Sequence, residues 1–296
     1  MEAHAPTHPI RMPPSDHVLT LSCPDRPGIL RAVSGFVLDN GGDVVECKQF
    51  GDRDLGRFFM RLQFAPVGAA FDAEQLREAF GELAAVYGMR WRLSSTADRA
   101  RVIIMVSKFG HCLNDLLFRA GSGALDVDIA AVVSNHPNLK FLADTYQIPF
   151  HHIPVTPDTK NDAEAQLLQL VDDLHVDLVV LARYMQILSE DLCKRLEGQA
   201  INIHHSVLPS FKGARPYHQA HDRGVKFIGA TAHYVTADLD EGPIIEQEVA
   251  RVDHSMSTQQ VTELGRDTEC LALARAVQWH ATNRVLLDGR RTVVFR

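Results

Sequence analysis

The sequence lacks the features that would mark a membrane protein or a disulfide-stabilised protein. No apolar run in its 296 residues approaches the ~20 residues that a membrane-spanning helix needs. The N-terminal stretch MEAHAPTHPIRMPPS has no apolar signal core and predicts a disordered tail. Only five cysteines occur, scattered and without a CxxC pair. We therefore expect a cytoplasmic protein with no disulfide framework and no membrane partner.

Basic charge is also scarce. The chain carries 30 Lys and Arg residues against 37 Asp and Glu residues, a formal net charge of −7. Because nucleic-acid-binding proteins usually present a basic face, this balance argues against a nucleic-acid partner. The hydrophobic content of 46% and charged content of 23% are ordinary for a globular protein, and a chain of this length commonly holds two domains.

The first of two patterns in the chain covers residues 15–96. Two stretches, 24–43 and 71–88, predict helices bounded by turn residues. Period-two alternation of apolar and polar residues predicts the strands, at 17–24, 43–50, 56–65 and 89–94. The resulting order, βαββαβ, is a ferredoxin-like arrangement.

The stretch LSCPDRPGIL joins the first predicted strand to the first helix. It resembles the opening of ACT domains, small ferredoxin-like modules that often bind amino acids and pair sheet to sheet. The resemblance implies a homodimer or homotetramer and an amino-acid effector such as methionine or glycine. The alternative is that Asp25, Pro27 and Gly28 only form the turn, because Gly and Pro favour turns for backbone reasons alone.

The second pattern covers residues 100–296. Apolar, β-rich runs alternate with helical stretches, which predicts an α/β fold with a mainly parallel, Rossmann-like sheet covered on both faces. A hairpin around ADLDEG and a long final helix over 257–287 complete this half. The other predicted strands are 101–110, 125–135, 147–155, 176–184 and 199–206, and the other predicted helices are 111–122, 138–146 and 162–175.

Polar residues gather where the strand QAINIHHS ends, and ligands of such sheets bind beyond the carboxyl ends of the strands. Alternation places Asn202 and His204 on one face and His205 on the other. Asp240 lies at the tip of the following hairpin. These residue types suit attack on a carbonyl group. An Asn amide can hold the oxyanion, a His can shuttle a proton, and an Asp can orient the imidazole or accept a proton.

The motifs NIHHSVLPSFKGARPYHQA and GATAHYVTADLDEGPIIEQ resemble the folate-dependent formyltransferase family, and the resemblance covers residues 101–296. The family signature is N-x-H on a strand, then S-x-L-P-x-x-x-G, then an Asp near a Gly. It implies that Asn202, His204 and Asp240 are catalytic. It also implies that backbone in VLARYMQILS and in the hairpin holds the pterin ring, although core packing is the alternative for the first segment. The implied substrate-binding residues are Met185, Gln186, Ile187, Leu188, Thr236, Ala237, Asp238 and Leu239.

Two features narrow this resemblance to one branch. Members that formylate glycinamide ribonucleotide carry a Gly/Ser-rich loop for a phosphate after the first strand, whereas Lys108, Phe109 and His111 fill that loop here. Methionyl-tRNA formyltransferases carry a C-terminal RNA-binding domain, whereas this acidic chain ends soon after its last predicted helix. The whole arrangement resembles the formyltetrahydrofolate deformylases.

That branch implies hydrolysis of 10-formyltetrahydrofolate to formate and tetrahydrofolate by direct attack of water. The folate is then the substrate, and no cofactor is expected. The activity would supply formate for purine synthesis and balance the one-carbon folate pools. Two alternatives stay open. One is a formyltransferase acting on an unidentified amine, which Lys108 and His111 do not exclude, and the other is a non-catalytic folate or amino-acid sensor.

The remaining histidines and loop residues are weaker candidates. The pairs His151-His152 and His204-His205 suggest metal binding, but adjacent strand residues point in opposite directions and no third ligand stands at zinc-like spacing. We therefore expect no metal site. Residues that either shape the cleft or are solvated loop groups are His205, Lys212, Arg215, Tyr217 and His218.

Overall fold

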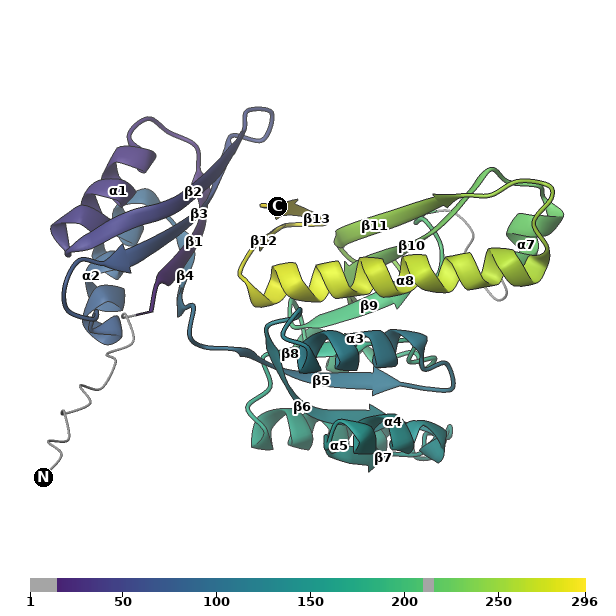
Figure 1. Ribbon diagram of the computed structural model, residues 1–296. Coiled ribbons are helices and arrows are strands. Elements are labelled where there is room, and N and C mark those ends of the chain that lie inside the picture. Colours follow the sequence, from purple (N-terminus) through teal and green to yellow (C-terminus); the bar gives the residue numbers. More distant parts are fainter. Residues whose placement is uncertain (1–14, 210–215) are drawn as a thin grey trace, which may run out of the picture. The chain divides into compact units, whose positions relative to one another are not determined.

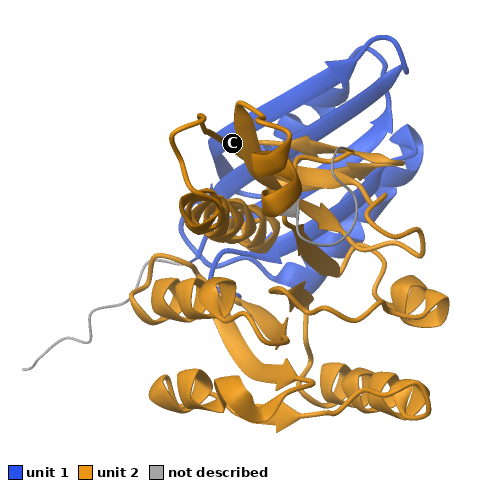
Figure 2. Cartoon of the chain, turned by 90° about the vertical axis from the view of Figure 1, so that its right-hand side faces the viewer, with its two compact units in different colours: residues 1–98 blue, residues 99–296 orange. Residues whose placement is uncertain are grey.

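The computed structural model describes residues 15–209 and 216–296. The expected N-terminal tail and the loop residues Lys212 and Arg215 lie outside the described residues. The chain divides into two compact units, Met1–Asp98 and Arg99–Arg296 (Figure 2). Each unit packs around hydrophobic clusters of its own, and each is described by itself below.

The N-terminal unit is a four-stranded antiparallel sheet with two helices (Figure 1). The strands lie in the spatial order β2-β3-β1-β4, so the predicted ferredoxin-like arrangement is confirmed. Val33 of the first helix and Phe80 of the second are buried in one cluster with the apolar side chains of the sheet. The elements are β1 (His17–Pro24), α1 (Ile29–Asp39), β2 (Gly42–Asp52), β3 (Arg57–Pro66), α2 (Ala73–Tyr87) and β4 (Arg90–Ser95).

The turn between β1 and α1 has a structural reason for its residue types. Gly28 caps α1 with a φ of +96°, a conformation that favours glycine. The backbone N–H of Asp25 donates to the carbonyl of Gly56 at 2.8 Å. Asp25, Pro27 and Gly28 are all exposed. Binding of an amino acid at this turn stays a prediction.

The C-terminal unit is built on a seven-stranded sheet in the order β11-β10-β9-β8-β5-β6-β7. The five strands from β5 to β9 are parallel, and β10 and β11 are antiparallel, which confirms the mainly parallel sheet. The elements are β5 (Ala100–Val106), α3 (His111–Gly121), β6 (Val127–Ser134), η1 (Pro137–Leu139), α4 (Lys140–Thr145), β7 (Phe150–His152), α5 (Lys160–Asp173), β8 (Leu178–Leu181), α6 (Glu190–Arg195), β9 (Ala200–His204), α7 (Pro216–Asp222), β10 (Phe227–Tyr234), β11 (Ile244–Arg251), α8 (Thr258–Ala281), β12 (Val285–Asp288) and β13 (Arg291–Val294).

Helices cover both faces of this sheet, as near-continuous apolar strands require. On one face, α3, α4 and α8 pack over residues such as Ile104 and Val180. On the other face, α5 and α6 pack over residues such as Ile103 and Val179. Neighbouring residues of one strand therefore point to opposite faces of the sheet and pack into different hydrophobic clusters. No helix in the described part of the chain has the length and apolar character to cross a membrane.

The prediction of one long final helix over 257–287 is wrong at its C-terminal end. Helix α8 ends at Ala281, and the backbone of Asn283 adopts a φ of +54°, which a continuing right-handed helix does not allow. The following residues form β12, which pairs with β13. Two short helices, α6 and α7, were also not predicted, since their six and seven residues are too few for a clear helical period.

Candidate active site

A cavity of about 250 Å³ lies at the carboxyl ends of β8 and β9. Three segments that are distant in sequence line it: the loop that follows β8, the end of β9, and the turn between β10 and β11. This is the edge of a parallel sheet at which ligands bind. All three sequence-predicted catalytic residues, Asn202, His204 and Asp240, line this cavity.

The end of β9 sets the directions of its histidines. Asn202 and His204 reach the same cavity, as strand alternation predicts. The expectation that His205 points away is wrong, because His205 also lines the cavity. The strand ends at His204, so alternation no longer governs the next residue. The two histidine rings lie 5.0 Å apart between centroids.

His204 and Asp240 form a pair across the cavity wall. Nδ1 of His204 lies 3.3 Å from Oδ2 of Asp240, and the hydrogen bond from His204 lowers the pKa of the Asp240 carboxyl. Asp240 is therefore a carboxylate at neutral pH. The other ring nitrogen of His204, Nε2, is buried and has no hydrogen-bond partner among the described residues. This nitrogen can exchange a proton with a ligand in the cavity.

His233 is a member of the site that the sequence analysis missed. It stands directly opposite Asn202 in the antiparallel register of β10 and β9, and its Nε2 lies 3.2 Å from Nδ2 of Asn202. Its Nδ1 lies 2.8 Å from the carbonyl oxygen of Tyr234. A carbonyl can only accept, so Nδ1 carries the hydrogen and Nε2 accepts a hydrogen bond from the Asn202 amide.

This hydrogen bond fixes how the amide of Asn202 is turned. Burial lowers the pKa of His233, which keeps the ring neutral and able to accept at neutral pH. One N–H of Asn202 is thus held by His233, and the second N–H, which has no partner among residues 15–209 and 216–296, can donate to a ligand. The register of the two strands was the signal that could have identified His233, because strands that follow each other often pair.

A close backbone approach fixes the turn that carries Asp240. A Cβ added to Gly242 would lie 1.7 Å from the carbonyl oxygen of Tyr234, so only glycine fits between the turn and β10. The backbone N–H of Tyr234 donates to the carbonyl of Pro243 at 2.9 Å. Asp240 itself adopts a φ of +58°, an uncommon conformation outside glycine. The turn is therefore held in one place relative to β10.

Most of the predicted substrate-binding residues lie in the cavity wall. Core packing does not explain Met185 and Ile187, whose side chains are 54% and 63% exposed. Asp238 is exposed and does not line the cavity, although its carbonyl accepts a hydrogen bond from Thr236 at 3.0 Å. The predicted residues found in the wall are Met185, Gln186, Ile187, Leu188, Thr236, Ala237 and Leu239.

A buried carboxylate lies close to this cavity, on helix α8. Glu269 is 1% exposed; it accepts hydrogen bonds from Tyr217 and from Nε2 of His111, the latter at 2.8 Å. Nη1 of Arg183 lies 3.3 Å away. Burial alone would raise the pKa of Glu269, but the hydrogen bond from His111 and the charge of Arg183 outweigh burial and lower it. His218, by contrast, is exposed on α7.

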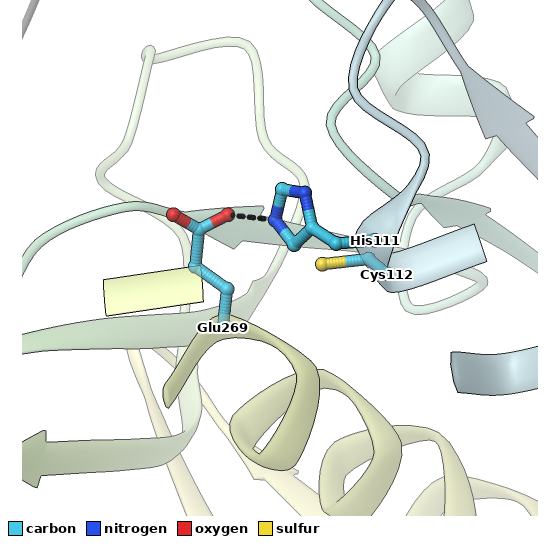
Figure 3. A group of neighbouring side chains, drawn as sticks. All are labelled: His111, Cys112 and Glu269. Carbon is cyan, nitrogen blue, oxygen red and sulfur yellow. Dashed lines mark hydrogen bonds and ion pairs between the residues drawn. The ribbon is translucent and has the colours of Figure 1, made fainter. Parts of the chain in front are cut away.

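The same region holds the group of side chains that could offer metal ligands in the described part of the chain, namely His111, Cys112 and Glu269 (Figure 3). Their ligand atoms lie within 4.8 Å of one another. Burial and a hydrogen bond with Cys270 raise the pKa of the Cys112 thiol, which opposes thiolate formation. The guanidinium of Arg183 beside Glu269 repels a cation. These contacts favour a hydrogen-bonded cluster over a metal centre.

The charges of both this cluster and the catalytic residues affect His205. Burial, followed by the positive charge of Arg183 and the neighbouring His204, lowers the pKa of His205 to about 4. The ring is therefore neutral at neutral pH. His151 and His152, the other adjacent histidines, lie on β7 at the far edge of the sheet and take no part in the cavity.

Comparisons with known proteins agree on one family. Residues 100–277 match the formyl transferase family. The chain is 54% identical to a formyltetrahydrofolate deformylase of Corynebacterium over 95% of this chain and 98% of that one. It is 41% identical to a formyltetrahydrofolate deformylase of Escherichia coli over 94% of this chain and 97% of that one.

Solved structures show the same relation. The crystal structure of a formyltetrahydrofolate deformylase from Burkholderia mallei is 52% identical, has a TM-score of 0.90, and is matched over 96% of this chain and 100% of that one. A glycinamide ribonucleotide transformylase from Symbiobacterium toebii is 27% identical with a TM-score of 0.63, over 69% of this chain and 98% of that one.

Proposed function

Because this chain belongs to the formyl transferase family, we propose that it hydrolyses 10-formyltetrahydrofolate to formate and tetrahydrofolate. One observation carries the proposal: His204, paired with Asp240, lies in the same cavity as the oriented amide of Asn202. Addition of water to a formyl carbon requires a base, here oriented by a carboxylate, and an adjacent hydrogen-bond donor for the oxyanion. The family relation identifies the substrate as a folate that carries a formyl group.

The hydrogen-bond directions suggest how the proton moves. Nδ1–H of His204 donates to Asp240, so Nε2 is free to take a proton from water as the water oxygen bonds to the formyl carbon. The free N–H of Asn202 stabilises the negative oxygen of the tetrahedral intermediate. The bond between the formyl carbon and N10 then breaks, and His204 returns the proton to N10. The formic acid ionises to formate.

The cavity wall suits a folate ring. Exposed apolar side chains of Met185, Ile187 and Leu239 stand beside the backbone of the loop after β8 and the β10–β11 turn. Ligand sites commonly combine such apolar walls with a few fixed polar groups. The loop after β8 is anchored, because the N–H of Met185 donates to Oγ of Ser107 at 3.0 Å. We place the pterin ring here and assign no cofactor.

The N-terminal unit presents an edge strand through which two copies of the chain could pair. Strand β2 is an edge strand, and Val45 and Phe50 on it are 56% and 46% exposed. An apolar edge strand can pair with a second copy of the chain. We propose on this ground that the chain forms a homodimer or homotetramer. The resemblance to ACT domains supports an amino-acid effector bound at the N-terminal unit, and we place the protein in the cytoplasm. Such an effector would bind in a different unit from the one that carries Asn202 and would change turnover.

Single-substrate turnover tests the proposed hydrolysis. The purified protein is given 10-formyltetrahydrofolate in buffer without any amine, and formate and tetrahydrofolate are both measured. Equal release of the two products is the expected result. In Asp240→Asn the release should fall by at least ~10²-fold, the size of a general acid–base contribution.

Asp238→Asn is the matched control, because its side chain lies on the same turn but is exposed and outside the cavity wall. This variant should keep full turnover. Release that requires an added amine would replace hydrolysis by formyl transfer. Folate binding without release of either product would make the protein a sensor.

A further inference from the structure

We propose that Arg183 binds a small carboxylate, the formate product, in the cavity that holds His204. This site would retain formate after the bond to N10 has broken and before formate leaves. The inference rests on the proposed function, because hydrolysis is the reaction that releases formate there.

The backbone holds Arg183 at the edge of the cavity. Arg183 follows β8 and adopts a φ of +66°, a conformation that residues other than glycine rarely take unless the surroundings enforce it. Its carbonyl accepts a hydrogen bond from the N–H of Ser107 at 3.3 Å. Arg183 lines the cavity, and its side chain is only 10% exposed. The side chain is thus largely buried, on a residue that lines the same cavity as the catalytic residues.

The described residues leave two donors of this guanidinium without a hydrogen-bond partner. Nε and Nη1 are buried, and neither has a hydrogen-bond acceptor among the described residues. Nη1 lies 3.3 Å from Oε2 of Glu269, which balances charge without satisfying the donor. A buried donor left unsatisfied is unfavourable, and the planar fork of Arg matches the two oxygens of a carboxylate.

Glu269 is not free to turn toward these donors. Its carboxylate already accepts hydrogen bonds from His111 and Tyr217, and Figure 3 shows it directed at the His111 ring. We place the acceptor for these donors in the cavity, because Arg183 is one of the residues that line it. A ligand that brings its own carboxylate oxygens meets this need.

The proposed hydrolysis would release formate into the cavity that Arg183 lines. The positive charge of Arg183 helps to lower the pKa of His205. The ring centroid of His205 lies 5.0 Å from that of His204. All three side chains line one cavity. Newly formed formate stands near the carboxylate of Asp240, which repels it. Attraction to Arg183 offsets this repulsion and gives the anion a defined place.

Formate binding can be measured without turnover. The full-length protein is mixed with ¹³C-labelled sodium formate at fixed ionic strength, and the line width of the formate resonance is followed. We expect broadening that unlabelled formate reverses and that sodium chloride does not. In Arg183→Met the affinity should fall by about 10- to 100-fold, the range that one or two charge-assisted hydrogen bonds supply. Arg183→Lys, which keeps the charge but not the fork, should lie in between.

The Glu269→Gln variant distinguishes direct formate binding by Arg183 from a role of the buried cluster in stabilising the fold. It alters the same buried cluster but leaves both free donors of Arg183, so it should keep or strengthen formate binding. Equal loss in Arg183→Met and Glu269→Gln, or unchanged binding in a folded Arg183→Met, overturns the proposal. If Arg183→Met does not fold, the Arg183→Lys variant decides. Formate binding in a protein without hydrolysis would refute the proposed function alone, and hydrolysis without formate binding would refute this site alone.

Discussion

At the scale of single residues, the site depends on how one amide is turned. Asn202 offers its N–H to a ligand only if its Nδ2 atom, and not its oxygen, faces the cavity. The Nε2 acceptor of His233, 3.2 Å away, enforces this orientation because its other nitrogen is committed to the carbonyl of Tyr234. His233 is therefore a positioning residue for the oxyanion donor.

A double-mutant cycle tests this dependence. Asn202→Ala should lower kcat by ~10²–10³-fold, as removal of an oxyanion donor does. His233→Ala should lower kcat by about tenfold, and the double variant should be no slower than Asn202→Ala, because the two residues act as one unit. His254→Ala, at an exposed histidine, is the control. Multiplying losses in the double variant would show that His233 acts independently of Asn202.

His205 makes a second prediction, on stability and pH. Its pKa is about 4 in the folded chain against 6.5 for an ordinary histidine, so the unfolded chain binds more protons between these values. Stability is therefore lost as the pH falls. The contribution of His205 to the free energy of unfolding should drop by about 2 kcal/mol from pH 7 to pH 5.

Urea unfolding followed by circular dichroism at the two pH values measures this loss. His205→Asn should show a smaller loss than the parent chain. The remaining pH dependence belongs to groups such as His233, whose pKa is also lowered by burial. The same loss in both proteins would contradict the assignment to His205.

Strand alternation and the resemblance to the formyltransferase family together predicted Asn202, His204 and Asp240 as one site, and all three line the same cavity. These two signals were not sufficient for His233, because its function depends on which residue of β9 it faces, and strand register is a tertiary property. They were wrong for His205, because alternation ends where the strand ends. Arg183 and Glu269 were not predicted as a pair, since they are 86 positions apart in the sequence and meet only through helix packing.

At the scale of elements, the turn between β10 and β11 places Asp240. The turn depends on contact between Gly242 and the backbone of Tyr234, where any Cβ would collide. A rigid backbone cannot relieve this collision without moving the turn. Displacement of about 1 Å at a catalytic group can cost ~10²-fold in rate.

Gly242→Ala should therefore lower kcat by about 10²-fold or more and also lower the melting temperature. Gly35→Ala is the matched control, since Gly35 lies in α1 and a Cβ there meets nothing within 4 Å. Alanine is the better helix former, so this change should stabilise the chain by about 0.5–1 kcal/mol. Normal turnover in Gly242→Ala would show that the turn adapts.

Long elements with clear periods were predicted well, and short ones were not. The apolar runs of the parallel strands and the period of α5 are strong signals. Helix α6 has six residues, and its one signal was the capping serine Ser189 before Glu190 and Asp191. The end of α8 was missed because Asn283 adopts a left-handed backbone conformation, which the composition alone does not predict.

At the scale of the whole molecule, the edge strand β2 makes the assembly testable. Sedimentation should show the intact chain as a homodimer or homotetramer, and Val45→Asp should shift it toward smaller species, because a charge on a buried pairing surface is costly. Leu38→Asp is the control: Leu38 is 73% exposed but lies on helix α1 and not on the edge strand. A monomeric parent chain would end the proposal of assembly through β2.

The facing pair of Asn202 and His233 has a consequence for how the sequence can change over generations. His233 loses its positioning role when Asn202 is replaced, and Asn202 loses part of its effect when His233 is replaced, so selection acts on the two positions together. A lineage that replaces one should soon replace the other, whereas we expect the exposed His254 to vary independently of both. Across many relatives, the two positions should covary more strongly than other facing pairs of β9 and β10, such as Ile203 and Ala232.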